Sequence, residues 1–327
     1  MRTDRVSIVD STLREGQQTY GVVFTPEGKL EIARQLERAR VDMIEVGHPF
    51  RSPEDLPTAQ NIAQQIRETI IVALGYAAEP TAVDLAWEAI RRAERPRIAL
   101  YLPCSDIRLE THLRQTRQQA LEPAVAAVKR ARDYCPDVEF APSDATRADP
   151  EYLCQIVEAV IAAGAGTVEL PDSLGYALPG EYASLVRRVQ RSVPNIGDVP
   201  ISVHCHDDLG LALANTLEGL QAGARQVSGC FNGLGERAGS AALEELVMVL
   251  DTRRDFYGLA TGIDTTQIYP TSQLISRVSG VPIQPNKSIV GANAFRHGSR
   301  IHRAGAVLAR QNYEIMDRST IGWPEKD

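Results

Sequence analysis

Two histidines separated by a single residue are the sharpest chemical feature of this 327-residue sequence. His204 and His206 lie in ISVHCH (201–206), a short apolar run typical of a β-strand. Residues i and i+2 of a strand point to the same face, ~7 Å apart along the chain, so both imidazoles can serve one metal ion. The alternative is a pair of hydrogen-bonded histidines in the core or at its edge.

An arginine next to a carboxylate follows the first apolar run, VSIVD (6–10). Arg14 and Glu15 stand in the segment that comes directly after it. Two histidines and one carboxylate would leave positions on a metal open for substrate or water. A metal polarises a carbonyl as a Lewis acid, and a neighbouring guanidinium can stabilise the oxyanion that forms. The alternatives are an ordinary surface ion pair for Arg14 and Glu15, and a simple turn cap for Asp10.

A repeated strand–helix unit must position these residues. Eight apolar runs bounded by Gly and Pro are typical of strands buried on both faces: 6–10, 41–47, 69–76, 97–103, 138–142, 166–172, 201–206 and 226–231. Eight helical patterns accompany them: 25–39, 53–68, 82–92, 119–133, 149–163, 180–193, 209–222 and 241–251. Eight such units in about 250 residues predict an α/β fold, a (β/α)8 TIM barrel. An open doubly wound sheet is the competitor, but no GxGxxG follows the first run.

The remaining residues predict a short, mainly helical C-terminal extension. We expect a catalytic barrel over 1–253 and a C-terminal subdomain over 254–327. The latter has one helical pattern (265–279), the extended VPIQPNK and a polar tail. It is too short to bury a core of its own, so we expect it to contact the barrel mouth, and that of a partner subunit in particular.

Polar residues gather at the ends of the predicted strands, where barrels of this kind build active sites. Besides the segments above, they include Asp144-Ala-Thr-Arg147, Pro171-Asp-Ser173 and the glycine-rich loop Asn232–Gly239. Such a loop can present backbone N–H groups to an anion, although loops of this kind are common. Cys205 alternates away from the two histidines and is interpreted as packing.

The composition narrows the class of protein. Lys and Arg number 35 and Asp and Glu 42, a net charge of −7, which argues against a nucleic-acid partner and a polybasic membrane binder. No apolar run approaches the ~18 residues that span a bilayer, and MRTDRVSIVD lacks the apolar segment of a signal peptide. The cysteines are dispersed with no CxxC pair, as in reduced proteins. We therefore expect a cytoplasmic enzyme.

Several separated motifs together resemble the DRE-TIM metallolyase superfamily, and more narrowly its acyl-CoA-condensing branch of 2-isopropylmalate, homocitrate and citramalate synthases. The main motifs are DSTLREGQQ (10–18), HCHDDLG (204–210) and GLGERAG (233–239). Shorter stretches extend the resemblance over nearly the whole chain: DATR (144–147), PDSLG (171–175), QPNK (284–287) and FRHGSRIH (295–302).

The resemblance implies a metal-dependent Claisen-type condensation. Acetyl-CoA, as co-substrate, would add to a 2-oxo acid and give a 2-alkylmalate-type product plus CoA. Glu15, His204 and His206 would hold the divalent metal, which is Mn, Mg, Zn or Co. Carried over motif by motif, Arg14 stabilises charge on the keto and enolate oxygens, while Ser173, Gln18 and Arg147 contact the substrate. His302 and Tyr313 match catalytic residues that reach into the partner's site, which implies a domain-swapped homodimer.

The chain departs from the family pattern at several positions. Ser143 stands where a glutamate is usual, a candidate for the catalytic base or its partner, and Ser240 stands where asparagine is common. Around His302 a glutamate is lost and arginines appear at 296, 300 and 303. This change predicts that Arg300 binds an anionic acceptor such as 2-oxoglutarate, oxaloacetate or phosphonopyruvate. The alternative is a solvated basic patch or an intersubunit salt bridge.

Two other functions compete with the condensation. The first is a carbon–carbon lyase of the hydroxymethylglutaryl-CoA lyase type, a branch that relies on a cysteine in the loop corresponding to 233–239, where this chain has none. The second is a non-catalytic, metabolite-binding barrel, which the changes at Ser143, Ser240 and Gly298 keep in consideration. Because the chain stops where larger relatives continue, we also expect no feedback control through a regulatory domain.

Overall fold

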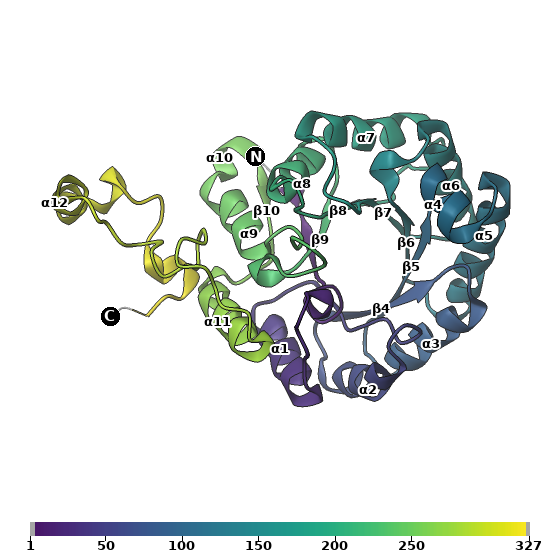
Figure 1. Ribbon diagram of the computed structural model, residues 1–327, viewed down its shortest axis with the longest axis horizontal. Coiled ribbons are helices and arrows are strands. Elements are labelled where there is room, and N and C mark those ends of the chain that lie inside the picture. The colour runs from purple at the N-terminus through teal and green to yellow at the C-terminus, as the bar shows by residue number, and fades with distance from the viewer. Residues whose placement is uncertain (1–3, 325–327) are drawn as a thin grey trace.

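The computed structural model describes residues 4–324 and shows eight parallel strands closed into a barrel (Figure 1). The strands follow one another in chain order, and the last pairs with the first. They are β2 (Ser7–Asp10), β3 (Met43–Glu45), β4 (Ile70–Tyr76), β5 (Pro96–Pro103), β6 (Val138–Ser143), β7 (Thr167–Asp172), β8 (Ile201–Cys205) and β9 (Gln226–Gly229). All eight predicted runs are strands, so the barrel is confirmed and the open sheet is excluded.

The strand sequences are continuous apolar runs because both faces of the sheet are covered by other side chains. Outward side chains join the main core with the helices, whereas Val9, Val72 and Ala99 belong to a separate apolar cluster inside the barrel. Towards the start of β5 the interior is polar, and Arg97 donates to the Glu139 carboxylate of β6 at 3.0 Å. The barrel interior is therefore filled with side chains below the mouth.

Helices connect the strands and surround the barrel (Figure 1). They are α1 (Pro26–Arg38), α2 (Leu56–Gln65), α3 (Pro80–Ile90), α5 (Arg117–Tyr134), α6 (Pro150–Ala163), α7 (Pro179–Ser192), α8 (Ala212–Gln221) and α9 (Leu243–Thr252). Each of the eight predicted helices is present, with bounds shifted by a few residues. The start of α1 follows its sequence signal, since the Thr25 side chain accepts the Gly28 N–H at 3.1 Å and Pro26 fills the first turn.

Several short elements escape prediction from the sequence. Between β5 and α5 the chain forms α4 (Asp106–Arg108) and a π-helical turn (Leu109–Leu113). Further along, α10 (Arg254–Tyr257) precedes β10 (Leu259–Ala260), which pairs with β1 (Asp4–Arg5). Elements of two to five residues show no hydrophobic period, so pattern analysis cannot detect them. Within residues 4–324 no helix is long and apolar enough to cross a membrane.

Beyond α9 the chain first packs on its own barrel. The predicted helix appears as α11 (Ile268–Ser279), which contacts α1. Trp323, close to the last described residue, packs against Tyr269 of α11 with ring centroids 4.1 Å apart. This part of the C-terminal region therefore belongs to the surface of the same subunit.

Between these contacts lies an arm, residues 296–317, that projects away from the barrel (Figure 1). Its main element is α12 (Arg300–Leu308), and none of residues 296–317 is buried. The sequence predicts a polar tail here, which is wrong for 300–308. The larger apolar residues of this helix, Ile301, Val307 and Leu308, are exposed in this chain. The boundary at residue 253 and docking on a partner subunit stay predictions.

Candidate active site

A cavity of about 280 Å3 opens at the carboxyl ends of the barrel strands. All eight strands, or the loops that follow them, contribute side chains to it. Six residues predicted from the sequence line it: Arg14, Glu15, Gln18, Ser173, His204 and His206. Parallel strands all end at the same rim, which brings together segments that are distant in the chain.

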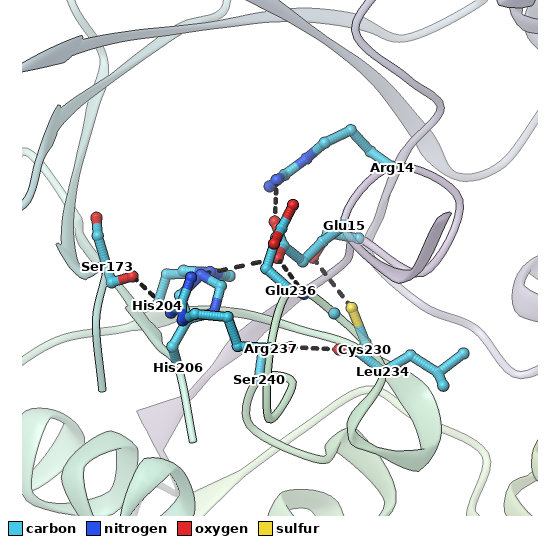
Figure 2. Close-up of polar contacts among 12 residues, drawn as sticks. Arg14, Glu15, Ser173, His204, His206, Cys230, Leu234, Glu236, Arg237 and Ser240 are labelled. Atoms are coloured by element: carbon cyan, nitrogen blue, oxygen red, sulfur yellow. Dashed lines mark hydrogen bonds and ion pairs between the residues drawn. The ribbon is translucent and has the colours of Figure 1, made fainter. Parts of the chain in front are cut away.

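Glu15, His204 and His206 lie close enough to share one metal ion. Their ligand atoms are all within 4.8 Å of one another, the only such group found in residues 4–324. The Nε2 atoms of the two imidazoles are 3.3 Å apart, and Nε2 of His206 is 3.7 Å from Oε1 of Glu15 (Figure 2). The predicted i, i+2 arrangement on β8 therefore brings both rings to the same point.

Backbone contacts and neighbouring strands fix these three side chains. The Glu15 N–H donates to the Ser11 carbonyl at 2.7 Å in the turn after β2. Oε1 of Glu15 accepts the Glu236 N–H at 3.1 Å, which ties it to the glycine-rich loop after β9. Nδ1 of His204 lies 3.3 Å from the Ser228 hydroxyl of β9. The carboxylate and the imidazole are thus oriented by groups that are not ligands themselves.

The charge states of the group suit metal binding. Burial and the neighbouring His206 lower the pKa of His204 to about 3, and burial also lowers the pKa of His206. Burial alone would raise the pKa of Glu15, but Arg14 and the two histidines outweigh it and hold that pKa at about 2. At neutral pH the group therefore offers two neutral imidazoles and one carboxylate. This donor set fits a divalent cation such as Zn, Mn, Co or Mg.

Arg14 is part of the same cluster. Its Nε donates to Oε2 of Glu45 on β3 at 2.8 Å, and its Nη1 donates to Glu15. Burial would lower its pKa, but the two carboxylates raise it further, so the guanidinium is charged. Arg14 and Glu15 are therefore not a surface pair, because their side chains are only 16% and 3% exposed and both line the cavity.

A run of hydroxyl groups lies on the side of the cavity formed by β6 and β7. Ser173 accepts the Asp144 N–H at 2.9 Å, and its Oγ is 3.3 Å from Oγ of Ser143. Both serines line the cavity. At position 143 this wall thus has a neutral hydroxyl where the family pattern usually has a carboxylate.

Arg147, predicted to contact the substrate, is not among the residues that line the cavity. Its guanidinium binds the Asp144 carboxylate with Nε at 2.9 Å and Nη2 at 2.6 Å. The Arg147 side chain therefore points toward Asp144 and away from the cavity. A contact between Arg147 and the substrate stays a prediction. The arginine of this wall that does reach the cavity is Arg108.

The three predicted residues of the arm lie away from the cavity of their own chain. The rings of His302 and Tyr313 stack with centroids 4.2 Å apart, and His302 and Arg300 are exposed on α12. None of them lines the cavity. A role for them in an active site requires the arm of another subunit.

Several cavity residues were not predicted as site residues, above all Arg108, Tyr101 and Glu169. Burial and the Glu139 and Glu45 carboxylates raise the pKa of Glu169 well above its usual range. A signal for Glu169 was available, because it is an acid inside the apolar run TVELPD, two residues before Pro171 and on the same face. No such signal exists for Arg108, which lies in the three-residue α4 after its strand.

The cysteines do not supply a nucleophile to the cavity. Cys230, at the end of β9, is buried, and Oγ of Ser11 lies 3.7 Å from its sulfur. Burial raises the pKa of its thiol, and the residue does not line the cavity. Cys205 is fully buried in the core, as expected from its alternation with the histidines.

Fold and site together define a TIM barrel with a candidate two-histidine, one-carboxylate metal centre at its mouth. The chain belongs to the HMGL-like family, which matches it over residues 5–275. It is 52% identical over 318 residues to the 2-isopropylmalate synthase of Syntrophus aciditrophicus (strain SB), covering 97% of this chain and 61% of that protein. The enzyme of the same name from Dictyoglomus turgidum is 50% identical over 321 residues, covering 98% of this chain and 63% of that protein. The chain thus spans about three-fifths of the length of these curated relatives.

Solved structures support the fold. A hydroxymethylglutaryl-CoA lyase from Pseudomonas aeruginosa superposes with a TM-score of 0.72 at 23% identity, covering 95% of this chain and 100% of that one. The HMG-CoA lyase of Bacillus subtilis gives a TM-score of 0.73 at 21% identity, covering 86% and 95%. At these identities the likeness concerns the barrel alone.

Proposed function

We propose that this protein catalyses the condensation of acetyl-CoA with a 2-oxo acid, giving a 2-alkylmalate-type product and CoA. The observation that carries the proposal is the convergence of Glu15, His204 and His206 beside Arg14 in one cavity. Identity of about half the residues to proteins named 2-isopropylmalate synthase supports it. The distant lyase structures share the barrel, but no cysteine is among the residues that line this cavity. Cys230, which lies nearby, is buried.

Glu15, His204 and His206 would hold the divalent metal. When bound, the metal supplies a Lewis acid for the keto group and carboxylate of the 2-oxo acid. Arg14 reaches the same point with its charge fixed by two carboxylates, so its N–H groups can stabilise negative charge on the keto and enolate oxygens. Because the cluster is buried, these interactions act in a medium with little competing water.

Ser173 would hold the carboxylate of the acid. Its hydroxyl oxygen already accepts the Asp144 N–H, so its proton is available for a substrate oxygen. The position at the end of β6 offers no carboxylate, because it is Ser143. The methyl proton of acetyl-CoA must therefore pass to another cavity group, and the carboxyl groups of Glu169 and Glu236 are the candidates.

The arm is proposed to complete the site of a second subunit. His302 and Tyr313 already stack as a pair, but they lie on an arm that leaves its own barrel (Figure 1). Its exposed apolar residues Ile301, Val307 and Leu308 would be covered in a domain-swapped homodimer. There Arg300 would stand near the bound acid. A cytoplasmic location agrees with the five free cysteines.

Free-thiol release from acetyl-CoA tests the proposal. The protein is assayed with Mn, Mg or Zn and, one at a time, pyruvate, 2-oxoisovalerate, oxaloacetate, 2-oxoglutarate and phosphonopyruvate. Metal-dependent release with one of these acids, lost in Glu15→Ala and His204→Ala, is the expected result. Silence with every acid, in protein that demonstrably binds metal, would reject the condensation.

A further inference from the structure

One wall of the cavity carries a charged group that the proposed condensation does not use. Arg108 of α4 follows β5 and lines the cavity with its side chain 30% exposed. Its Nη1 donates to Oγ of Ser143 at 3.1 Å, and its Nε lies 3.4 Å from the Asp144 carboxylate. The guanidinium therefore borders the space that a substrate would occupy.

The charge of Arg108 is only partly compensated. Asp144 is fully buried and also accepts hydrogen bonds from Arg147 at 2.9, 3.2 and 2.6 Å. One carboxylate thus serves two guanidinium groups, and Arg147 makes the closer contacts. This corner of the site has an excess of one positive charge, on the arginine that faces the cavity.

The serine at position 143 preserves this excess. A glutamate there, as in the usual family pattern, would stand next to Arg108 and neutralise it. Ser143 instead accepts a hydrogen bond from the guanidinium without adding charge. Its Oγ is also 3.3 Å from Oγ of Ser173, the hydroxyl proposed to hold the acid's first carboxylate. Ser143 therefore lies between the Arg108 guanidinium and the Ser173 hydroxyl that is proposed to bind the first carboxylate of the acid.

Two acidic residues of the cavity have arginine partners of their own. Glu45 is paired with Arg14 and Glu139 with Arg97. Burial and the neighbouring Glu139 and Glu45 carboxylates raise the pKa of Glu169 on β7, which disfavours a negative charge on this group. Glu45 and Glu139 are therefore already engaged by arginines other than Arg108.

We propose that Arg108 and Ser143 form a subsite for a second anionic group, so that the acceptor is a 2-oxo dicarboxylic acid. This inference rests on the proposed condensation and names its substrate class. A guanidinium can bind a carboxylate through two parallel hydrogen bonds. A branched aliphatic chain in the same place would displace water from the guanidinium without replacing its hydrogen bonds, which is unfavourable.

Substrate preference in matched variants tests the subsite. We expect the wild type to favour oxaloacetate or 2-oxoglutarate over 2-oxoisovalerate in kcat/KM. Arg108→Met should lower kcat/KM for the dicarboxylic acids roughly 10- to 100-fold, the size of a charged hydrogen bond, and should not lower kcat/KM for 2-oxoisovalerate. Ser143→Glu, which keeps the arginine but neutralises it, should cause the same selective loss. Arg117→Met removes a guanidinium paired with Asp106 outside the cavity and should change neither.

Equilibrium binding separates this inference from the proposed reaction. Titration calorimetry with oxaloacetate, 2-oxoglutarate and 2-oxoisovalerate is carried out on Mn-supplemented wild type and Arg108→Met, after thermal melts show that both fold. If no acid releases CoA but Arg108→Met selectively loses the dicarboxylic acids, the condensation fails and the subsite stands. Equal loss for all three acids, or a wild type that prefers 2-oxoisovalerate, overturns the subsite.

Discussion

The barrel mouth and the C-terminal arm both carry residues that the sequence assigns to one active site, but the structure holds them in opposite ways. At the mouth, Glu15 and His204 are 3% and 5% exposed and are oriented by groups from other strands. On the arm, Ile301 and Val307 are 73% and 87% exposed, and no residue is buried. Side chains at the mouth are thus positioned by the core of their own chain.

The two regions differ in what holds their side chains in place. A buried carboxylate or imidazole is held by hydrogen bonds and packing that exist before any ligand arrives. The arm has local order, in α12 and the stacked His302 and Tyr313, but no surface of its own chain covers its apolar side. The mouth is preorganised, whereas the apolar side chains of the arm are exposed in this chain.

Removing a metal ligand at the mouth should have the largest effect. Glu15→Ala and His204→Ala are expected to lower CoA release by roughly 10³-fold or more, since Lewis-acid stabilisation contributes several kcal/mol. Bound metal, measured by elemental analysis after dialysis, should fall in parallel. His112→Ala, an exposed histidine outside the cavity, is the control. Full activity without bound metal would show that the cluster is structural.

Mixing two inactive proteins tests whether the arm acts on another subunit. His302→Ala and Glu15→Ala should each be inactive alone. In a mixed dimer, one site would combine an intact mouth with an intact arm, so partial CoA release should return. Mixed dimers that form, as seen by native mass spectrometry, but stay inactive would contradict exchange of arms.

Substitutions in the barrel and in the arm should also differ in their effect on the free energy of unfolding. Leu36 of α1 is fully buried, so Leu36→Ala should lower the free energy of unfolding by about 2–5 kcal/mol. Val307→Ala on the arm should change it by less than about 0.5 kcal/mol in dilute protein. Urea denaturation at two protein concentrations measures both values. A cost for Val307→Ala that grows with concentration would place the arm in an interface, and an equal cost in monomers would contradict its exposure.

A further expected effect is a pH dependence of the free energy of unfolding that comes from Asp10 at the end of β2. Burial raises the pKa of this carboxyl to about 7, so the folded protein keeps a proton that the unfolded chain loses near pH 4. The protonated Asp10 carboxyl therefore contributes fully to the free energy of unfolding below pH 4. This contribution is lost as the pH rises to 7, and the free energy of unfolding falls by up to ~1.4 kcal/mol per pH unit. Asp10→Asn cannot titrate and should flatten this fall, measured by urea denaturation in EDTA. Above pH 8 the two curves should run parallel, and equal slopes between pH 4 and 7 would contradict the raised pKa.

Local patterns account for most of what could be predicted. Each barrel strand has a continuous apolar run and each surrounding helix a period of 3.6, so both could be recognised without knowing their partners. The pairing of His204 with His206 needed only the alternation of a strand. Short elements such as α4 carry no hydrophobic period, so they could not be detected.

Local periodicity and the common direction of parallel strands were enough to predict the barrel, the two histidines that share a face, and the rim at which the polar segments meet. Which arginine faces the cavity depends on contacts that form only in the folded chain. Arg147 and Arg108 compete for the single Asp144 carboxylate, and the closer contacts of Arg147 leave Arg108 at the cavity. That outcome depends on distances between β5, β6 and their loops, which no spacing along the chain contains. The arm's exposure is likewise a property of the folded chain, since it depends on which surfaces remain uncovered.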